Sequence, residues 1–223
     1  MSVVTATILS GGKVMDPTYE LVSIDVRREV DRIPSANLML LDGDAPQRVF
    51  PISDMDFFEP GKEIEIKLRY EGEPGGDQTV FKGMVIRHGV ESRPPRSFLT
   101  VELKDAAVRL TQGRRSKVFR DQTDDQAIGA ILAAAGLKKG AVAKADPQQP
   151  ELVQYHCTDW DFILSRADFH GLRVVVEDGV VSVRAIETTG AAKHRFEHGI
   201  DEVFEFEMEA DASDQAPEFA GVS

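Results

Sequence analysis

The first hundred residues contain short runs in which apolar and polar side chains alternate. The clearest run is 63–70, where isoleucine, leucine and tyrosine occupy every second position between charged residues. A strand with one buried face requires this period of two. Weaker runs with turn-forming residues between them cover 5–9, 21–30, 36–41, 79–91 and 98–104. This spacing predicts an antiparallel barrel or sandwich over residues 1–115.

The pattern becomes helical at residue 123. Thr123 and Gln126 resemble a capping box, and the apolar residues that follow recur at intervals of three and four. Gly136 stands where a helix commonly ends. We therefore predict a helix near 123–135, followed by a loop over 140–150.

A second helix is expected at 159–170, after a short strand over 152–156. Thr158 or Asp159 would cap it, and Gly171 has the position of a left-handed C-terminal residue. Trp160, together with Ile163 and its apolar neighbours, falls on one helical face. Such a face can contact a ligand or partner, but it is more commonly part of a core.

The strongest hairpin signal in the chain follows this helix. Asp178 and Gly179 separate the apolar runs 173–177 and 180–184. This dipeptide favours a type I′ turn, in which both central residues have positive φ. Beyond residue 185 the chain is polar and acidic, apart from an alternating run at 203–208 that predicts one more strand.

Composition and charge exclude several classes of function. The 38 acidic and 26 basic residues give a net charge of −12, which repels nucleic acid. The basic cluster Arg114, Arg115 and Lys117 beside Gly113 is typical of a solvated turn. The N-terminus lacks the features of a Sec signal, and no apolar run is long enough to span a membrane. We expect synthesis in the cytoplasm and no membrane-spanning segment.

Candidate catalytic groups are sparse. The single cysteine, Cys157, excludes an internal disulfide, and it would need His170 and Asp168 as partners to act as a nucleophile. His194 and His198 form an i, i+4 pair without a third metal ligand at diagnostic spacing. We expect no catalytic residue, no metal and no cofactor.

Two further patterns have simple structural interpretations. The acidic pairs Asp124–Asp125 and Asp159–Asp161 stand at helix starts, where carboxylates are favoured, although two carboxylates across a cleft would also suit a glycosidase. The stretch Ser10-Gly11-Gly12-Lys13 lacks the spacing of a phosphate-binding loop and is expected to connect two strands.

The segment 153–172 resembles the signature of the VgrG spike proteins and the related phage late control protein D. The matching residues, in the order of that signature, are Tyr155, Asp159, Phe162, Ile163, Arg166 and Gly171. Phe81-Lys-Gly-Met-Val85 is similar to a strand of the same family, and the resemblance covers about residues 60–208. The spacing around Leu164–His170 departs from the usual pattern, so this helix could contact its neighbour differently.

The resemblance implies a mainly β fold with an α+β insertion. Residues 1–115 would form the first barrel-like hub domain, 116–185 an α/β segment, and 186–223 the start of a second barrel and an acidic linker toward a spike region. The structural motif would comprise Tyr155, Asp159, Trp160, Phe162, Ile163, Arg166, Gly171, Asp178 and Gly179.

The function implied by the resemblance is a structural baseplate hub of a contractile injection system, such as a phage tail, a type VI secretion system or an extracellular injection particle. The expected partners are two further copies in a homotrimer, a hexameric tail tube protein, baseplate components, and a spike tip or cargo effector. A tail-associated peptidoglycan hydrolase and a stand-alone binding module are the competing hypotheses.

Overall fold

The fold was obtained as a computed structural model, which describes residues 4–43, 49–72, 75–93, 96–187, 189–192, 194–200 and 205–210. The chain divides into two units, 1–186 and 187–223, and each is described by itself. The first unit holds all the described strands and helices, and the fold is mainly β, as the sequence predicts.

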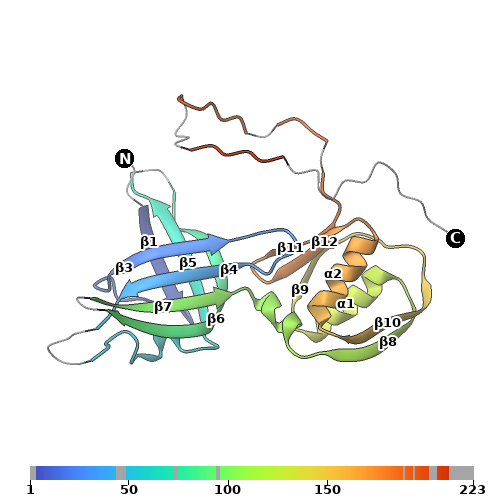
Figure 1. The fold of residues 1–223 in the computed structure, drawn as a ribbon, viewed down its shortest axis with the longest axis horizontal. Helices are drawn as coiled ribbons and strands as arrows, with labels where there is room; N and C mark the ends of the chain where they lie inside the picture. The colour runs from blue at the N-terminus through green and yellow to red at the C-terminus, as the bar shows by residue number, and fades with distance from the viewer. Residues whose placement is uncertain are drawn as a thin grey trace. The chain divides into compact units, whose positions relative to one another are not determined.

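Seven antiparallel strands form the N-terminal lobe of the first unit, and their sheet is strongly curved (Figure 1). Their order across the sheet is β2-β1-β5-β6-β7-β4-β3. The strands are β1 (Val4–Ser10), β2 (Lys13–Val14), β3 (Leu21–Arg27), β4 (Ser35–Leu41), β5 (Glu63–Tyr70), β6 (Gln78–Arg93) and β7 (Arg96–Lys104).

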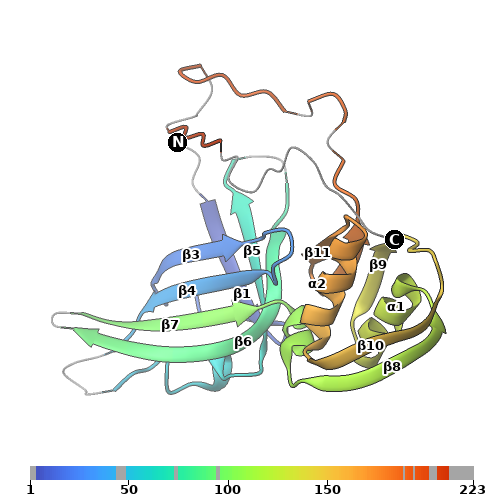
Figure 2. The ribbon, with the colours of Figure 1, turned by 45° about the vertical axis from the view of Figure 1, so that its right-hand side comes forward.

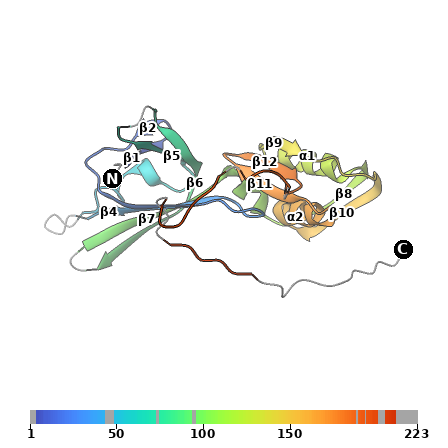
Figure 3. The same ribbon diagram turned by 90° about the horizontal axis from the view of Figure 1, so that it is seen from above.

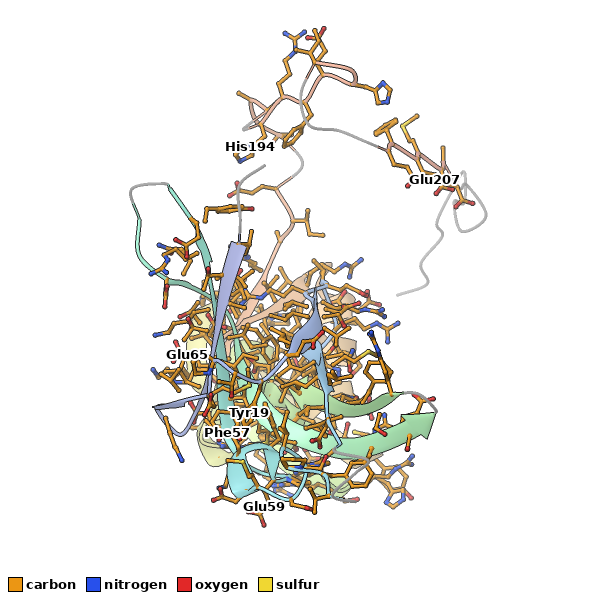
Figure 4. The ribbon with its side chains drawn as sticks, turned by 90° about the vertical axis from the view of Figure 1, so that its left-hand side faces the viewer. Tyr19, Phe57, Glu59, Glu65, His194 and Glu207 are labelled. Atoms are coloured by element: carbon orange, nitrogen blue, oxygen red, sulfur yellow. The ribbon has the colours of Figure 1, made fainter. Side chains whose placement is uncertain are left out.

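Alternating residues of these strands line the core of the lobe. Ile64 and Ile66 of β5 are fully buried, as the alternation at 63–70 predicts. A short 3-10 helix, η1 (Asp56–Phe58), adds Phe57 and Phe58 to the same core, with ring centroids 4.8 Å apart. Tyr19, labelled with Phe57 in Figure 4, packs against this cluster. The side chains on one face of the curved sheet therefore form the core of this lobe.

The α/β lobe follows from residue 106. It comprises η2 (Ala106–Thr111), β8 (Arg115–Gln122), α1 (Asp124–Ala134), β9 (Lys138–Val142), β10 (Gln149–Cys157), α2 (Asp159–Phe169), β11 (Arg173–Glu177) and β12 (Val180–Arg184). Strands β8 and β10 form an antiparallel ribbon, whereas β11, β12 and β9 form a three-stranded sheet. Both helices contact the ribbon and the sheet, and together they enclose a second apolar core (Figures 1 and 3).

Most elements lie where the sequence places them. Thr123 and Gln126 form the expected capping box, and α1 and α2 fall within the predicted helices. Three strands were not predicted: β2, β8 and β9. The expected loop over 140–150 is wrong at both ends, because β9 extends to Val142 and β10 begins at Gln149.

The second unit contains no strand or helix in its described residues. The expected strand at 203–208 lies partly outside the described residues, and 205–208 carry no strand. Phe206 and Met208 are 72% and 80% exposed. In the described parts of the chain, no helix combines the length and apolar character needed to cross a membrane.

Candidate functional site

Helix α2 carries the core of the sequence motif. Trp160, Phe162 and Ile163 are buried, and Phe162 stacks on Phe119 of β8 with ring centroids 5.6 Å apart. Thr158, one of the two caps that the sequence suggests, accepts a hydrogen bond from the Asp161 amide at 3.0 Å. The apolar face around Trp160 is therefore core rather than a ligand or partner contact.

Arg166 and His170 bind one buried carboxylate, that of Asp124 at the start of α1. Arg166 donates from Nε and Nη2 to the two carboxylate oxygens at 2.5 and 2.8 Å, and His170 donates from Nε2 at 2.7 Å. Burial raises the pKa of Asp124, but the hydrogen bonds from Arg166 and His170 outweigh it and hold the pKa below its ordinary value. This network ties the first turn of α1 to the last turn of α2.

Asp159 connects α2 to the ribbon. Its carboxylate accepts a hydrogen bond from Gln154 Nε2 at 2.9 Å and lies 3.5 Å from Arg115 Nε. Gln154 and Asp159 are both buried. Buried polar groups of this kind are stable only when they have partners. Asp124 and Asp159, one member of each acidic pair, therefore connect elements in addition to lying where the helix dipole favours a carboxylate.

Gly171 ends α2 in the left-handed conformation that the sequence predicts, with φ 64°. The amides of Leu172 and Gly171 donate to the carbonyls of Ala167 and Asp168, which is the Schellman pattern. The chain then reverses directly into β11, so this residue sets the direction of the hairpin.

The β11–β12 hairpin meets the N-terminal lobe at its turn. Asp178 and Gly179 have φ values of 49° and 78°, as a type I′ turn requires. The Gly179 amide donates to Asp105 Oδ2 at 2.8 Å, and Arg28 Nη2 lies 3.2 Å from Asp178 Oδ1. Burial raises the pKa of Asp105, and its two backbone donors offset that effect only in part.

Asp31 forms a second connection between the lobes. Its amide donates to the Val174 carbonyl at 2.9 Å, and its carboxylate accepts from the Val174 amide at 2.8 Å. Arg173 lies 3.6 Å from Asp31 and 2.9 Å from Asp168. Asp31, Asp105 and Arg28 are not distinguished by any pattern in the sequence analysis above. The sequence does offer one signal for Asp105. It directly precedes Ala106 and Ala107, and aspartate is a common N-cap residue, which is its role at the start of η2.

Tyr155 differs from the rest of the motif because its side chain is 80% exposed. It lies on β10, one residue before a bulge at which His156 adopts φ 44°. The exposed side chain contributes no packing to the core, and its role must therefore lie at the surface.

The structure separates the proposed cysteine site. His170 lies at the C-terminal end of α2, where it is hydrogen-bonded to Asp124, whereas Cys157 precedes the N-terminus of that helix. Eleven helical residues span roughly 16 Å, too far for a nucleophile and its base. Asp168 is paired with Arg173 instead.

The remaining candidates from the sequence are the histidine pair, the glycine-containing stretch at Ser10–Lys13 and paired carboxylates. Among the described residues, no three metal-ligating side chains gather, and His194 stacks near Phe196 in the second unit. Ser10 to Lys13 make the turn between β1 and β2, as expected. A cavity of about 170 Å³ beside the hairpin turn is lined by Glu63 and Asp178, but Lys82 pairs with the first and Arg28 with the second.

The arrangement therefore holds elements in place through charged and polar contacts. Asp124 links the two helices, Asp159 links a helix to the ribbon, and Asp105 and Asp31 link the two lobes. Each of these carboxylates is occupied by donors from the chain itself. The contacts that the motif makes are those of a scaffold.

The model of the family described as the Alg8 N-terminal domain matches residues 1–223. No curated protein matches the sequence significantly. In structure, the chain is similar to the 43 kDa tail protein of prophage MuSo2 from Shewanella oneidensis, with a TM-score of 0.59 and 14% identity over 82% of this chain and 53% of that one.

Two further structures show the same fold. The tail protein from Neisseria meningitidis MC58 has a TM-score of 0.55 and 16% identity over 81% of this chain and 50% of that one. The E. coli c3393 protein, a type VI secretion component similar to the T4 bacteriophage tail proteins gp27 and gp5, has a TM-score of 0.57 and 14% identity over 79% of this chain and 48% of that one. The chain thus spans about half the length of each of these three structures.

Proposed function

The chain belongs to the Alg8 N-terminal domain family, and we propose, from its fold, that it is a structural hub subunit of a contractile injection system. The observation that carries this proposal is the fold shared with two tail proteins, one of them from a prophage, and a type VI secretion component over about four fifths of the chain. The hub joins the tail tube to the spike and catalyses no reaction.

The site supports a structural role. The motif residues on α2 and the hairpin form hydrogen bonds that connect the two helices, the helix to the ribbon, and the two lobes. Asp178 and Glu63, the two carboxylates that line the cavity beside the hairpin turn, are paired with Arg28 and Lys82, and Asp124 is paired with Arg166. A peptidoglycan hydrolase therefore gains no support from the geometry.

In this proposal three copies assemble into a ring. Each copy supplies the N-terminal lobe as one barrel, and residues 186–223 begin a second barrel and a linker toward the spike. Six barrels in the trimer would match a hexameric tail tube, while baseplate components and a spike tip or cargo effector bind elsewhere. Phe206 and Met208, which are 72% and 80% exposed in this chain, are apolar side chains that such an assembly would bury.

The proposal places the protein in a phage tail-like particle or secretion apparatus after synthesis in the cytoplasm. Light scattering during gel filtration tests the assembly step on the protein made from the complete gene. We expect the mass of three chains at micromolar concentration, and retention of a hexameric tail tube protein in a pull-down. A persistent monomer that degrades peptidoglycan would overturn the proposal.

A further inference from the structure

The outer face of the β8–β10 ribbon carries uncovered apolar side chains. Val118 and Val153 lie opposite each other across the two strands, 45% and 56% exposed, and Tyr155 follows on β10. Phe119 and Leu152, the next pair along, are buried beneath the helices. The ribbon therefore has a covered inner face and an apolar outer face that no described part of the first unit covers.

Strand β8 also has an unpaired edge. Among the described strands it pairs only with β10, and Figures 1 and 2 both show it at the outer margin of the α/β lobe. A strand edge presents backbone donors and acceptors that an extended segment of another protein can pair with. This edge lies directly beside the outer apolar face.

The charge of β8 is opposite to that of the whole chain. It carries Arg115, Lys117 and Arg120 against one acidic residue, and Arg114 precedes it, in a chain of net charge −12. Arg115 and Lys117 share the side of Phe119, with Lys117 Nζ 4.5 Å from the centre of that ring, whereas Val118 points outward. Arg115 lies 3.5 Å from Asp159 and Arg120 lies 3.2 Å from Glu151, so Lys117, next to the outward Val118, is the cation that this edge offers to a partner.

We propose that the free edge of β8 is a docking site for an extended acidic segment of a partner protein. In an added strand, apolar side chains would lie beside Val118 on the outer face, and the carboxylates between them would face Lys117 on the other side. The partner is therefore a segment in which carboxylates and apolar residues alternate. This proposal does not depend on the hub function.

A synthetic peptide of the sequence Glu-Val-Glu-Phe-Glu-Val-Glu is the probe, and the 223-residue chain is the target. We expect saturable binding in fluorescence anisotropy that weakens at least fivefold between 50 and 200 mM salt, because the contact includes charge pairs. Hydrogen exchange should slow at residues 115–120. A peptide with lysine at the four glutamate positions should not bind.

Two variants test the two halves of the site. Lys117→Glu and Val118→Ser are each expected to weaken binding of the acidic peptide at least tenfold. Lys13→Glu on β2 and Val30→Ser, at a valine of similar exposure (48%), are matched controls and should change it less than twofold. Thermal melting would confirm that all four variants remain folded.

Several outcomes would overturn the proposal. These are equal binding of the lysine peptide, slowed exchange confined to other strands, and an affinity that neither variant changes. Self-association of the chain through the ribbon, seen as a mass that rises with concentration and falls in Val118→Ser, would identify a second copy as the occupant instead. None of these results alters the expected trimer mass of the complete protein.

Discussion

At the residue scale, Asp124 shows how one buried carboxylate holds two helices together. Its pKa is lowered in the fold, so its ionised form adds stability above the unfolded pKa of about 4, and that stability is lost as the pH falls through the folded pKa. We expect Asp124→Asn to reduce the free energy of unfolding at pH 7 by ~3 kcal/mol, because Arg166 and His170 lose a charged partner. Urea unfolding at pH 7 and pH 3 measures this difference, which should shrink at the lower pH.

Asp161→Asn is the matched control for that prediction. Asp161 also lies in the first turn of a helix, but it is exposed. Removing its charge should therefore reduce stability by less than about 1 kcal/mol. Equal losses for the two variants would show that helix-dipole effects, rather than the buried network, explain the role of Asp124.

The contribution of Asp105 to folding stability depends on pH in the opposite direction from that of Asp124. Burial raises its pKa, so the stability linked to its protonated form is present below the unfolded pKa and is lost as the pH rises through the folded pKa. Asp105→Ala leaves the amides of Ala107 and Gly179 without their acceptor and should cost about 2–4 kcal/mol. The stability gap to the unaltered protein should widen from pH 7 to pH 4.5 in denaturant titrations, and a gap that narrows would contradict the raised pKa.

At the scale of elements, the end of α2 depends on the backbone of Gly171. A Cβ there would meet no atom within 4 Å, so Gly171→Ala tests conformation alone. Because φ is 64°, we expect a loss of about 1 kcal/mol in chemical unfolding. Gly75→Ala, which also has open space but no positive φ, should be neutral or slightly stabilising. Equal effects of the two substitutions would argue against the left-handed cap.

Elements fixed by neighbouring residues were the ones that the sequence could predict. The capping box at Thr123 and the Asp178-Gly179 turn depend on interactions within a few residues, and both were found where expected. Strand β8 was missed because only Phe119 within it is fully buried, which leaves no alternation to detect. Strand β9 pairs in parallel with β12, some forty residues later, and no local pattern encodes such a pairing.

At the scale of the whole molecule, the polar contacts between the lobes could not be predicted. The bond from Gly179 to Asp105 joins residues 74 apart in sequence, and that from Val174 to Asp31 joins residues 143 apart. Asp31 and Asp105 look like ordinary turn and cap residues in the sequence. The sequence motif located the hairpin correctly, but only the folded chain shows that its turn is bound to the first lobe.

The second unit supplies the final prediction, which concerns the protein made from the complete gene. If residues 203–208 form the first strand of a second barrel, Phe206 and Met208 would face its core. Phe206→Asp would then bury a charge, and we expect a loss of at least 3 kcal/mol and of the trimer, measured by thermal melting and light scattering. Glu207→Gln, on the opposite face of that strand, is the control and should change neither. In the unassembled chain, where Phe206 is 72% exposed, both substitutions should leave the melting temperature unchanged. A complete protein that stays trimeric and equally stable with Phe206→Asp would exclude a buried strand at this position.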